Sequence, residues 1–194
     1  MVTNDLKWAE RSAFDPEQRH PRRGLPSWIL LPVALIFIAV GGVYAFSITF
    51  SQFAEYDDQG TMMVCIRGYL EGHPLYESIR LMYGPFYFIY EGMLHRLTCL
   101  PVTHDITGGI WIVHWLAAAS ILALAGGLMT RSALLGVFIF MQATVHLQRL
   151  AREPGHPQGL VVLVLALAIL VVATGSLRGW RLALLGMFGA VLVF

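Results

Sequence analysis

The sequence has 194 residues, of which 57% are hydrophobic and only 13% carry a formal charge. Soluble domains have about 25% charged residues, so this composition favours a membrane protein over a soluble one. The 13 Lys and Arg against 12 Asp and Glu leave a net charge of +1. The strongly basic surface of a nucleic-acid-binding protein is therefore excluded, and we expect no nucleic acid partner.

Residues 1-27 are polar and predict a cytoplasmic tail, and the apolar run that follows is too long for a cleaved signal peptide. A helical span needs about 20 apolar residues. Residues 28-194 therefore predict an all-α polytopic membrane domain with five spans, at about 28-50, 110-130, 132-148, 159-175 and 182-194. The last run is shorter than a full span, so we interpret the chain as the N-terminal part of a longer protein. A tilted or re-entrant last helix is the alternative.

Positive charge predicts how these spans are oriented, because cytoplasmic connections are enriched in Lys and Arg. The connections expected inside carry Arg22, Arg23, Arg131, Arg178 and Arg181. Loops 51-109 and 148-158 are then extracytoplasmic, and the protein is expected in the cell (inner) membrane with its N-terminus in the cytoplasm.

The long outer loop contains two helical patterns. One apolar face is formed by Met62, Ile66, Tyr69 and Leu70, and a second by Phe86, Ile89, Tyr90, Met93, Leu94 and Leu97. Asp57 or Asp58 suits the N-cap of the first helix and Gly72 its end, while Pro85 suits the first position of the second helix. We expect two short helices that lie on the outer membrane surface.

Two adjacent carboxylates, Asp57 and Asp58, follow Glu55 just beyond the first span. Carboxylates this close raise one another's pKa, which suits a general base or a cation site. For Asp58 a capping role alone is an equal alternative. The loop also holds Cys65 and Cys99, which either form a disulfide outside the cytoplasm or remain two free thiols.

The second outer loop reads QRLAREPGHPQ and is dense in polar side chains, namely Arg149, Arg152, Glu153, His156 and Gln158. Arginine forks bind phosphate or carboxylate groups, so an arginine pair outside predicts an anionic partner. An ordinary polar loop is the alternative. Within the spans, His114 is expected to be a packing histidine bonded to backbone.

The motifs of the first outer loop, taken together, resemble the GT-C class of membrane glycosyltransferases. They are Asp57-Asp58-Gln59-Gly60, Leu70-Glu71-Gly72, Pro74-Leu75-Tyr76 and Tyr83-Gly84-Pro85-Phe86-Tyr87. The resemblance is to the group of protein O-mannosyltransferases, aminoarabinose transferases and lipopolysaccharide galacturonosyltransferases. It covers roughly residues 28–175.

The resemblance implies a sugar transferase with a polyprenyl-phosphate donor, an extracytoplasmic acceptor and further spans beyond this chain. It implies that Asp57 is the catalytic carboxylate and that Glu153 joins it. Many relatives have a lysine near Tyr83-Gly84, and Arg80, Arg149 or Arg152 is expected to replace it at the donor phosphate.

The remaining residues expected to bind donor or acceptor are Asp58, Tyr83, Glu153, His156 and Gln158. A divalent cation, Mg²⁺ or Mn²⁺, held by Asp57, Glu153 and His156 is an optional cofactor, and membrane lipids are expected partners. The rival interpretation is a non-catalytic membrane protein, such as a transporter, an accessory subunit or an inactive fragment.

Overall fold

The structure is a computed structural model and describes residues 27–51, 58–79, 83–148, 156–175 and 179–193. Within these residues the expected all-helical fold is confirmed, and the only strand-like pairing is a single bridge between Leu75 and Ile79. The helices are α1 (Ser27–Ser51), α2 (Asp58–Leu70), α3 (Pro85–Thr98), α4 (His104–Thr130), α5 (Ala133–Leu147), α6 (Gln158–Ala173) and α7 (Trp180–Val193).

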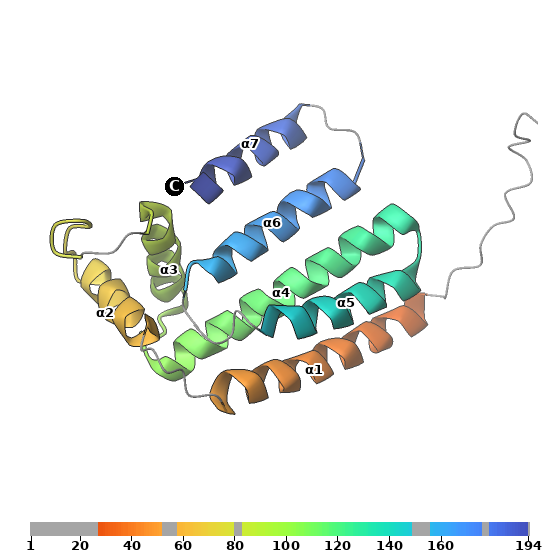
Figure 1. Cartoon of the computed structure of the whole chain (residues 1–194), viewed down its shortest axis with the longest axis horizontal. Coiled ribbons are helices and arrows are strands. Elements are labelled where there is room, and N and C mark those ends of the chain that lie inside the picture. The colour runs from red at the N-terminus through yellow and green to blue at the C-terminus, as the bar shows by residue number, and fades with distance from the viewer. Residues whose placement is uncertain (1–26, 52–57, 80–82, 149–155, 176–178, 194) are drawn as a thin grey trace, which may run out of the picture.

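Five of these helices lie side by side and alternate in direction, whereas α2 and α3 lie across one end of the bundle (Figure 1). The central helix is α4, which contacts α1, α5 and α6. The last residues of α1 and the first residues of α4 and α6 lie at the end that carries α2 and α3, and α5 runs toward the same end (Figure 1). We call this the loop end, and the opposite end, with the α4–α5 and α6–α7 connections, the turn end.

Two helices are long and apolar enough to cross a membrane, namely residues Leu31–Ser51 of α1 and the whole of α4. Their length and composition indicate a membrane protein. The helices α5, α6 and α7 are apolar but shorter than a full span. All five coincide with the predicted apolar runs, so the pattern of spans in the sequence corresponds to a pattern of helices.

The start of α4 differs from the prediction, because the helix begins at His104 and not near residue 110. The Thr103 side chain caps it by accepting a hydrogen bond from the Ile106 N–H at 3.4 Å. Asp105 in the first turn adds a favourable interaction with the helix dipole. The first turns of α4 are therefore polar but helical, and they project beyond the apolar run into the loop end.

The helices α2 and α3 pack through a cluster of buried side chains that includes Met62, Ile66 and Phe88. The predicted apolar face of α2 therefore faces the protein. As expected, α3 begins at Pro85, and α2 ends just before Gly72, whose φ of +91° favours glycine.

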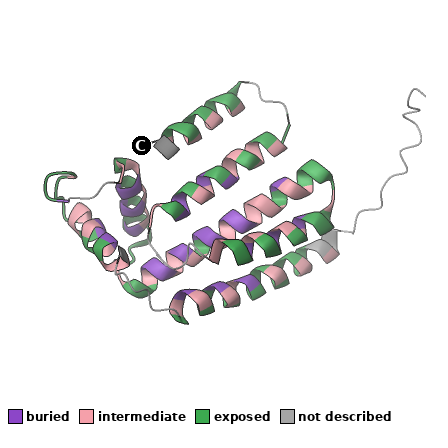
Figure 2. Cartoon of the chain, viewed as in Figure 1, coloured by how far each residue is buried: buried purple, intermediate pink, exposed green. Residues whose placement is uncertain are grey.

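The face of α3 that packs on the bundle is the less apolar one. Its buried residues are Tyr87, Phe88, Glu91, Gly92 and His95. Ile89, Met93 and Leu97 of the predicted apolar stripe are exposed, whereas Tyr90 and Leu94 of the same stripe line a groove against α4. Figure 2 shows the buried side of α3 beside the loop ends of α4 and α6. This orientation suits a helix that presents apolar side chains to lipid and polar ones to protein.

Candidate functional site

The structure describes some of the site residues predicted in loops 51–109 and 148–158 and leaves others outside the described residues. Those that lie outside the described residues are Asp57, Arg80, Arg149, Arg152 and Glu153. Asp58 is described by its backbone as the first residue of α2, and Gln158 is the exposed first residue of α6. The predictions for the undescribed residues remain predictions.

Two of the predicted site residues, Tyr83 and His156, are in contact, although they come from different loops. The Tyr83 hydroxyl and His156 Nε2 are 2.5 Å apart and form a hydrogen bond. The two rings are edge to face with centroids 5.0 Å apart. Tyr83 lies two residues before the start of α3 and His156 lies two residues before the start of α6, so this contact joins the segments that lead into these two helices.

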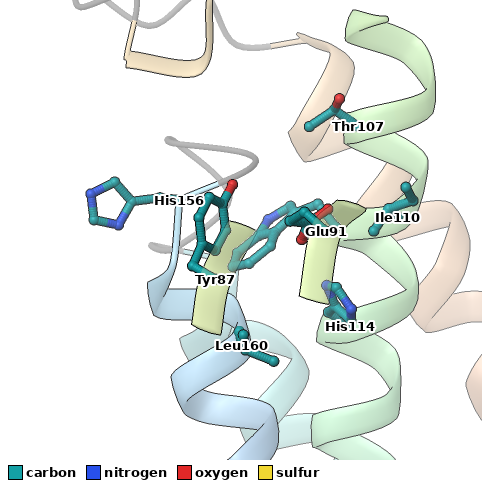
Figure 3. A pocket seen from close by; sticks show the side chains of 8 residues that line it. Tyr87, Glu91, Thr107, Ile110, His114, His156 and Leu160 are labelled. Carbon is teal, nitrogen blue, oxygen red and sulfur yellow. The ribbon is translucent and has the colours of Figure 1, made fainter. Parts of the chain in front are cut away.

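Next to this contact lies a pocket between α3, α4 and the start of α6 (Figure 3). Its lining residues are Tyr87, Glu91, Thr107, Ile110, Trp111, His114, His156 and Leu160. The pocket measures about 260 Å³ with its open mouth included. Its enclosed part holds about one water molecule, so it fits a water or a single hydroxyl group of a larger ligand.

Glu91 is the acid of this pocket, and its side chain is only 5% exposed. Burial raises the pKa of its carboxyl group to about 7. Within the described residues, no Lys, Arg or His forms an ion pair with it; the ion pair found there joins His73 and Glu71. Glu91 therefore changes protonation near neutral pH, which suits an acid or a base in proton transfer.

Several other polar atoms around the pocket have no hydrogen-bond partner among the described residues. They are Thr107 Oγ1, Trp111 Nε1 and His156 Nδ1. Thr107 and Trp111 are 3% and 4% exposed. Buried polar groups without partners are rare in folded proteins, since each costs about 1–3 kcal/mol. Thr107 and Trp111 line the same pocket, which indicates a site that takes up a polar group, whereas the His156 ring points away from Glu91 (Figure 3).

Tyr90 and His114 close the pocket on the side of the bundle. The Tyr90 hydroxyl and His114 Nε2 are 2.5 Å apart and form a hydrogen bond. The packing role predicted for His114 holds, because the side chain is 7% exposed. Its hydrogen-bond partner is the Tyr90 hydroxyl and not the expected backbone group. Burial, together with the charge of Glu91, raises the pKa of Tyr90 to about 12, so this hydroxyl keeps its proton.

An apolar groove of about 1000 Å³ begins at the pocket and continues between α3 and α4. Ile110 and His114 line both the pocket and the groove. Most of the other lining residues are apolar, such as Leu94, Val113 and Leu163, and Asp105 is the charged residue among them. A small polar pocket thus opens into a long apolar groove, which is an arrangement that fits an amphipathic molecule.

The described residues form no group of three His, Cys, Asp or Glu that could hold a metal ion. Two of the three ligands expected for a divalent cation, Asp57 and Glu153, lie outside the described residues. The third, His156, offers an imidazole nitrogen, whereas Mg²⁺ and Mn²⁺ prefer oxygen ligands. The two cysteines are free, with Cys65 half-buried and Cys99 exposed, so they form no disulfide.

No protein-family model, curated protein or solved structure matches this chain. The function is therefore argued from the residues and their geometry.

Sequence reasoning did not find Glu91, Thr107 or Trp111. The signal for Glu91 was its position on α3, because Tyr87, Glu91 and His95 repeat every four residues on the face opposite the apolar stripe. If the apolar stripe is in contact with lipid, the face that carries Tyr87, Glu91 and His95 must pack against protein. No comparable signal marks Thr107 and Trp111, because they lie in a largely apolar helix and acquire their role only through α3.

Proposed function

We propose that this chain is the N-terminal part of a GT-C-like membrane glycosyltransferase with five spans and an extracytoplasmic loop end. It would transfer a sugar from a polyprenyl-phosphate donor to an extracytoplasmic acceptor, in the cell (inner) membrane. The observation that carries the proposal is the polar pocket that opens into an apolar groove of about 1000 Å³. A lipid-linked sugar has the same two parts, a polar head and a long apolar chain.

The position of the pocket supports the assignment of Asp57. The last residues of α1 reach α4 beside Thr107, because a Cβ placed on Gly108 would lie 2.9 Å from the ring of Phe50. In the sequence, residues 52–57 connect the end of α1 to Asp58, the first residue of α2, and they lie outside the described residues. Asp57 belongs to this short connection.

In the proposed reaction, Asp57 takes the proton of the acceptor hydroxyl as the oxygen attacks the anomeric carbon. The bond from that carbon to the lipid phosphate breaks, and the phosphate leaves with the electron pair. Arg149 or Arg152 would stabilise its charge. A divalent cation held by Asp57, Glu153 and His156 is an optional cofactor, and it would add stabilisation of the phosphate charge.

Asp57→Asn in the full-length protein tests this function. The amide cannot accept the proton, so we expect sugar transfer to fall by a factor of about 10² or more, with normal membrane insertion. The measurement is mass spectrometry of envelope glycans in a deletion strain that carries each variant. Glu77→Gln, an exposed acid in the same loop, is the matched control. Wild-type transfer by Asp57→Asn would refute the assignment.

A further inference from the structure

A second large groove lies at the turn end, between α1, α4 and α5, and has a volume of about 1110 Å³. Its walls are almost entirely apolar. They include Val33, Phe37 and Ile38 of α1, Leu124 and Leu128 of α4, and Val137 and Phe140 of α5. The turn end is opposite the candidate functional site, so this groove plays no part in the proposed transfer.

The groove exists because α1 packs tightly only along its half nearer the loop end. There Ala45 and Thr49 are buried at 0% and 5% exposure. A Cβ on Gly41 would lie 3.2 Å from the ring of Phe140, so the contact with α5 is close at this level. Nearer the turn end, none of the α1 residues from Leu31 to Val40 is buried. The space that α1 leaves there is the groove.

One charged residue, Arg131, lines the groove, and it lies at the turn end. It forms the connection between α4 and α5 with a φ of +54°. Within the described residues its guanidinium group has no ion pair and no side-chain hydrogen bond. The hydroxyl group of Ser132 lies beside it in the lining. An apolar groove with one cationic side chain at its end is complementary to an amphiphile that has an anionic head group.

We propose that this groove binds an anionic phospholipid, with an acyl chain between α1 and α5 and the phosphate on Arg131. A guanidinium group binds phosphate oxygens through two parallel hydrogen bonds. The arginine distribution places the turn end in the cytoplasmic leaflet, where basic residues attract anionic lipids. Free phosphate could bind Arg131 but would leave the apolar walls of the groove uncovered. A lipid without net negative charge could cover these walls but would leave the positive charge of Arg131 without a counter-charge.

The test is native mass spectrometry of the full chain, released from membranes with equal amounts of phosphatidylglycerol and phosphatidylcholine. We expect the wild type to retain phosphatidylglycerol about tenfold over phosphatidylcholine, the size of one charge-assisted hydrogen-bonded contact. Arg131→Gln should remove this preference. Arg181→Gln is the matched control, because Arg181 stacks on Trp180 and is absent from the groove lining. It should keep the preference.

A second pair of variants tests the groove without changing charge. Ala34→Phe fills the groove and should reduce retention of phosphatidylglycerol about tenfold, whereas Val40→Phe, on an exposed part of α1 outside the lining, should not. Equal retention of both lipids by the wild type would overturn the proposal. So would an unchanged preference in Arg131→Gln, displacement by inorganic phosphate alone, or a polypeptide segment that occupies the groove in place of lipid. None of these outcomes depends on sugar transfer.

Discussion

The carboxyl group of Glu91 is buried in a pocket where its ionised form has no counter-charge among the described residues. Its surroundings are two aromatic residues, Tyr87 and Trp111, with the hydroxyl group of Thr107 nearby. Such surroundings favour the neutral acid, which can donate a hydrogen bond. A neutral acid beside unpartnered polar atoms is well suited to hold the hydroxyl group of a ligand and to exchange a proton with it.

This burial makes stability depend on pH. The pKa of Glu91 is about 7 in the folded chain against an ordinary value of 4.5, so between these values the folded state holds a proton that the unfolded state has lost. Stability should therefore fall as pH rises from about 4.5 to about 7, by up to about 3 kcal/mol.

Glu91→Gln should flatten this decline and exceed the wild type in Tm at about pH 8. Thermal unfolding in detergent across this pH range is the measurement. Glu77→Gln, which changes an exposed acid, should keep the wild-type profile. A parallel decline in Glu91→Gln and wild type would show that another group causes it.

Gly159 on α6 packs against the Trp111 ring, and a Cβ placed there would overlap the indole. Gly159→Ala should therefore displace Trp111 and destabilise the chain by about 1–3 kcal/mol. Gly186 on α7 has no atom within 4 Å of its added Cβ. Gly186→Ala should instead stabilise α7 slightly, because alanine has the higher helix propensity. Thermal unfolding of both variants checks the pair, and equal effects would contradict the packing of Trp111 on Gly159.

At the scale of elements, α3 decides the geometry of the site. The sequence predicted the apolar stripe and the start of the helix at Pro85. The sequence does not say which neighbour each face meets, because periodicity is a property of one helix alone. The structure packs the Tyr87, Glu91 and His95 face against the bundle and leaves Met93 outward. That choice buries the acid and creates the pocket.

The outward stripe of α3 should be in contact with lipid. A nitroxide spin label at Met93→Cys, in a chain whose two native cysteines are replaced by serine, should collide with oxygen more than with a water-soluble nickel chelate. A label at Glu77→Cys, in the exposed loop before α3, should show the reverse preference. Electron paramagnetic resonance in lipid bilayers measures both. Preferential access of the nickel chelate to the Met93 label would place the stripe in water.

At the scale of the whole molecule, the alternating helices set two opposite ends. The loop end carries the pocket and the exposed Cys99, and the turn end carries Arg131 (Figure 1). Because α1, α4, α5, α6 and α7 alternate in direction along the chain, the end of α1 and the end of α5 both point toward the loop end. The contact between Tyr83 and His156 is the consequence.

This arrangement predicts the labelling of the two ends in intact cells. A membrane-impermeant maleimide should label Cys99 from outside. It should label Arg131→Cys, with both native cysteines replaced by serine, only after permeabilisation. Cys65 should react slowly, because burial raises the pKa of its thiol. The opposite pattern would reverse the proposed orientation of the chain.

The helical class, the apolar runs that become α1 and α5 to α7, and the start and end signals at Pro85 and Gly72 could all be predicted from the sequence. These follow from composition and from periodicity, which act over a few residues. Only the tertiary structure decided that Glu91, Trp111 and His156 share a pocket. The burial that raises the pKa of Glu91 comes from helices distant in the chain, and no local pattern records which helix will cover an acid.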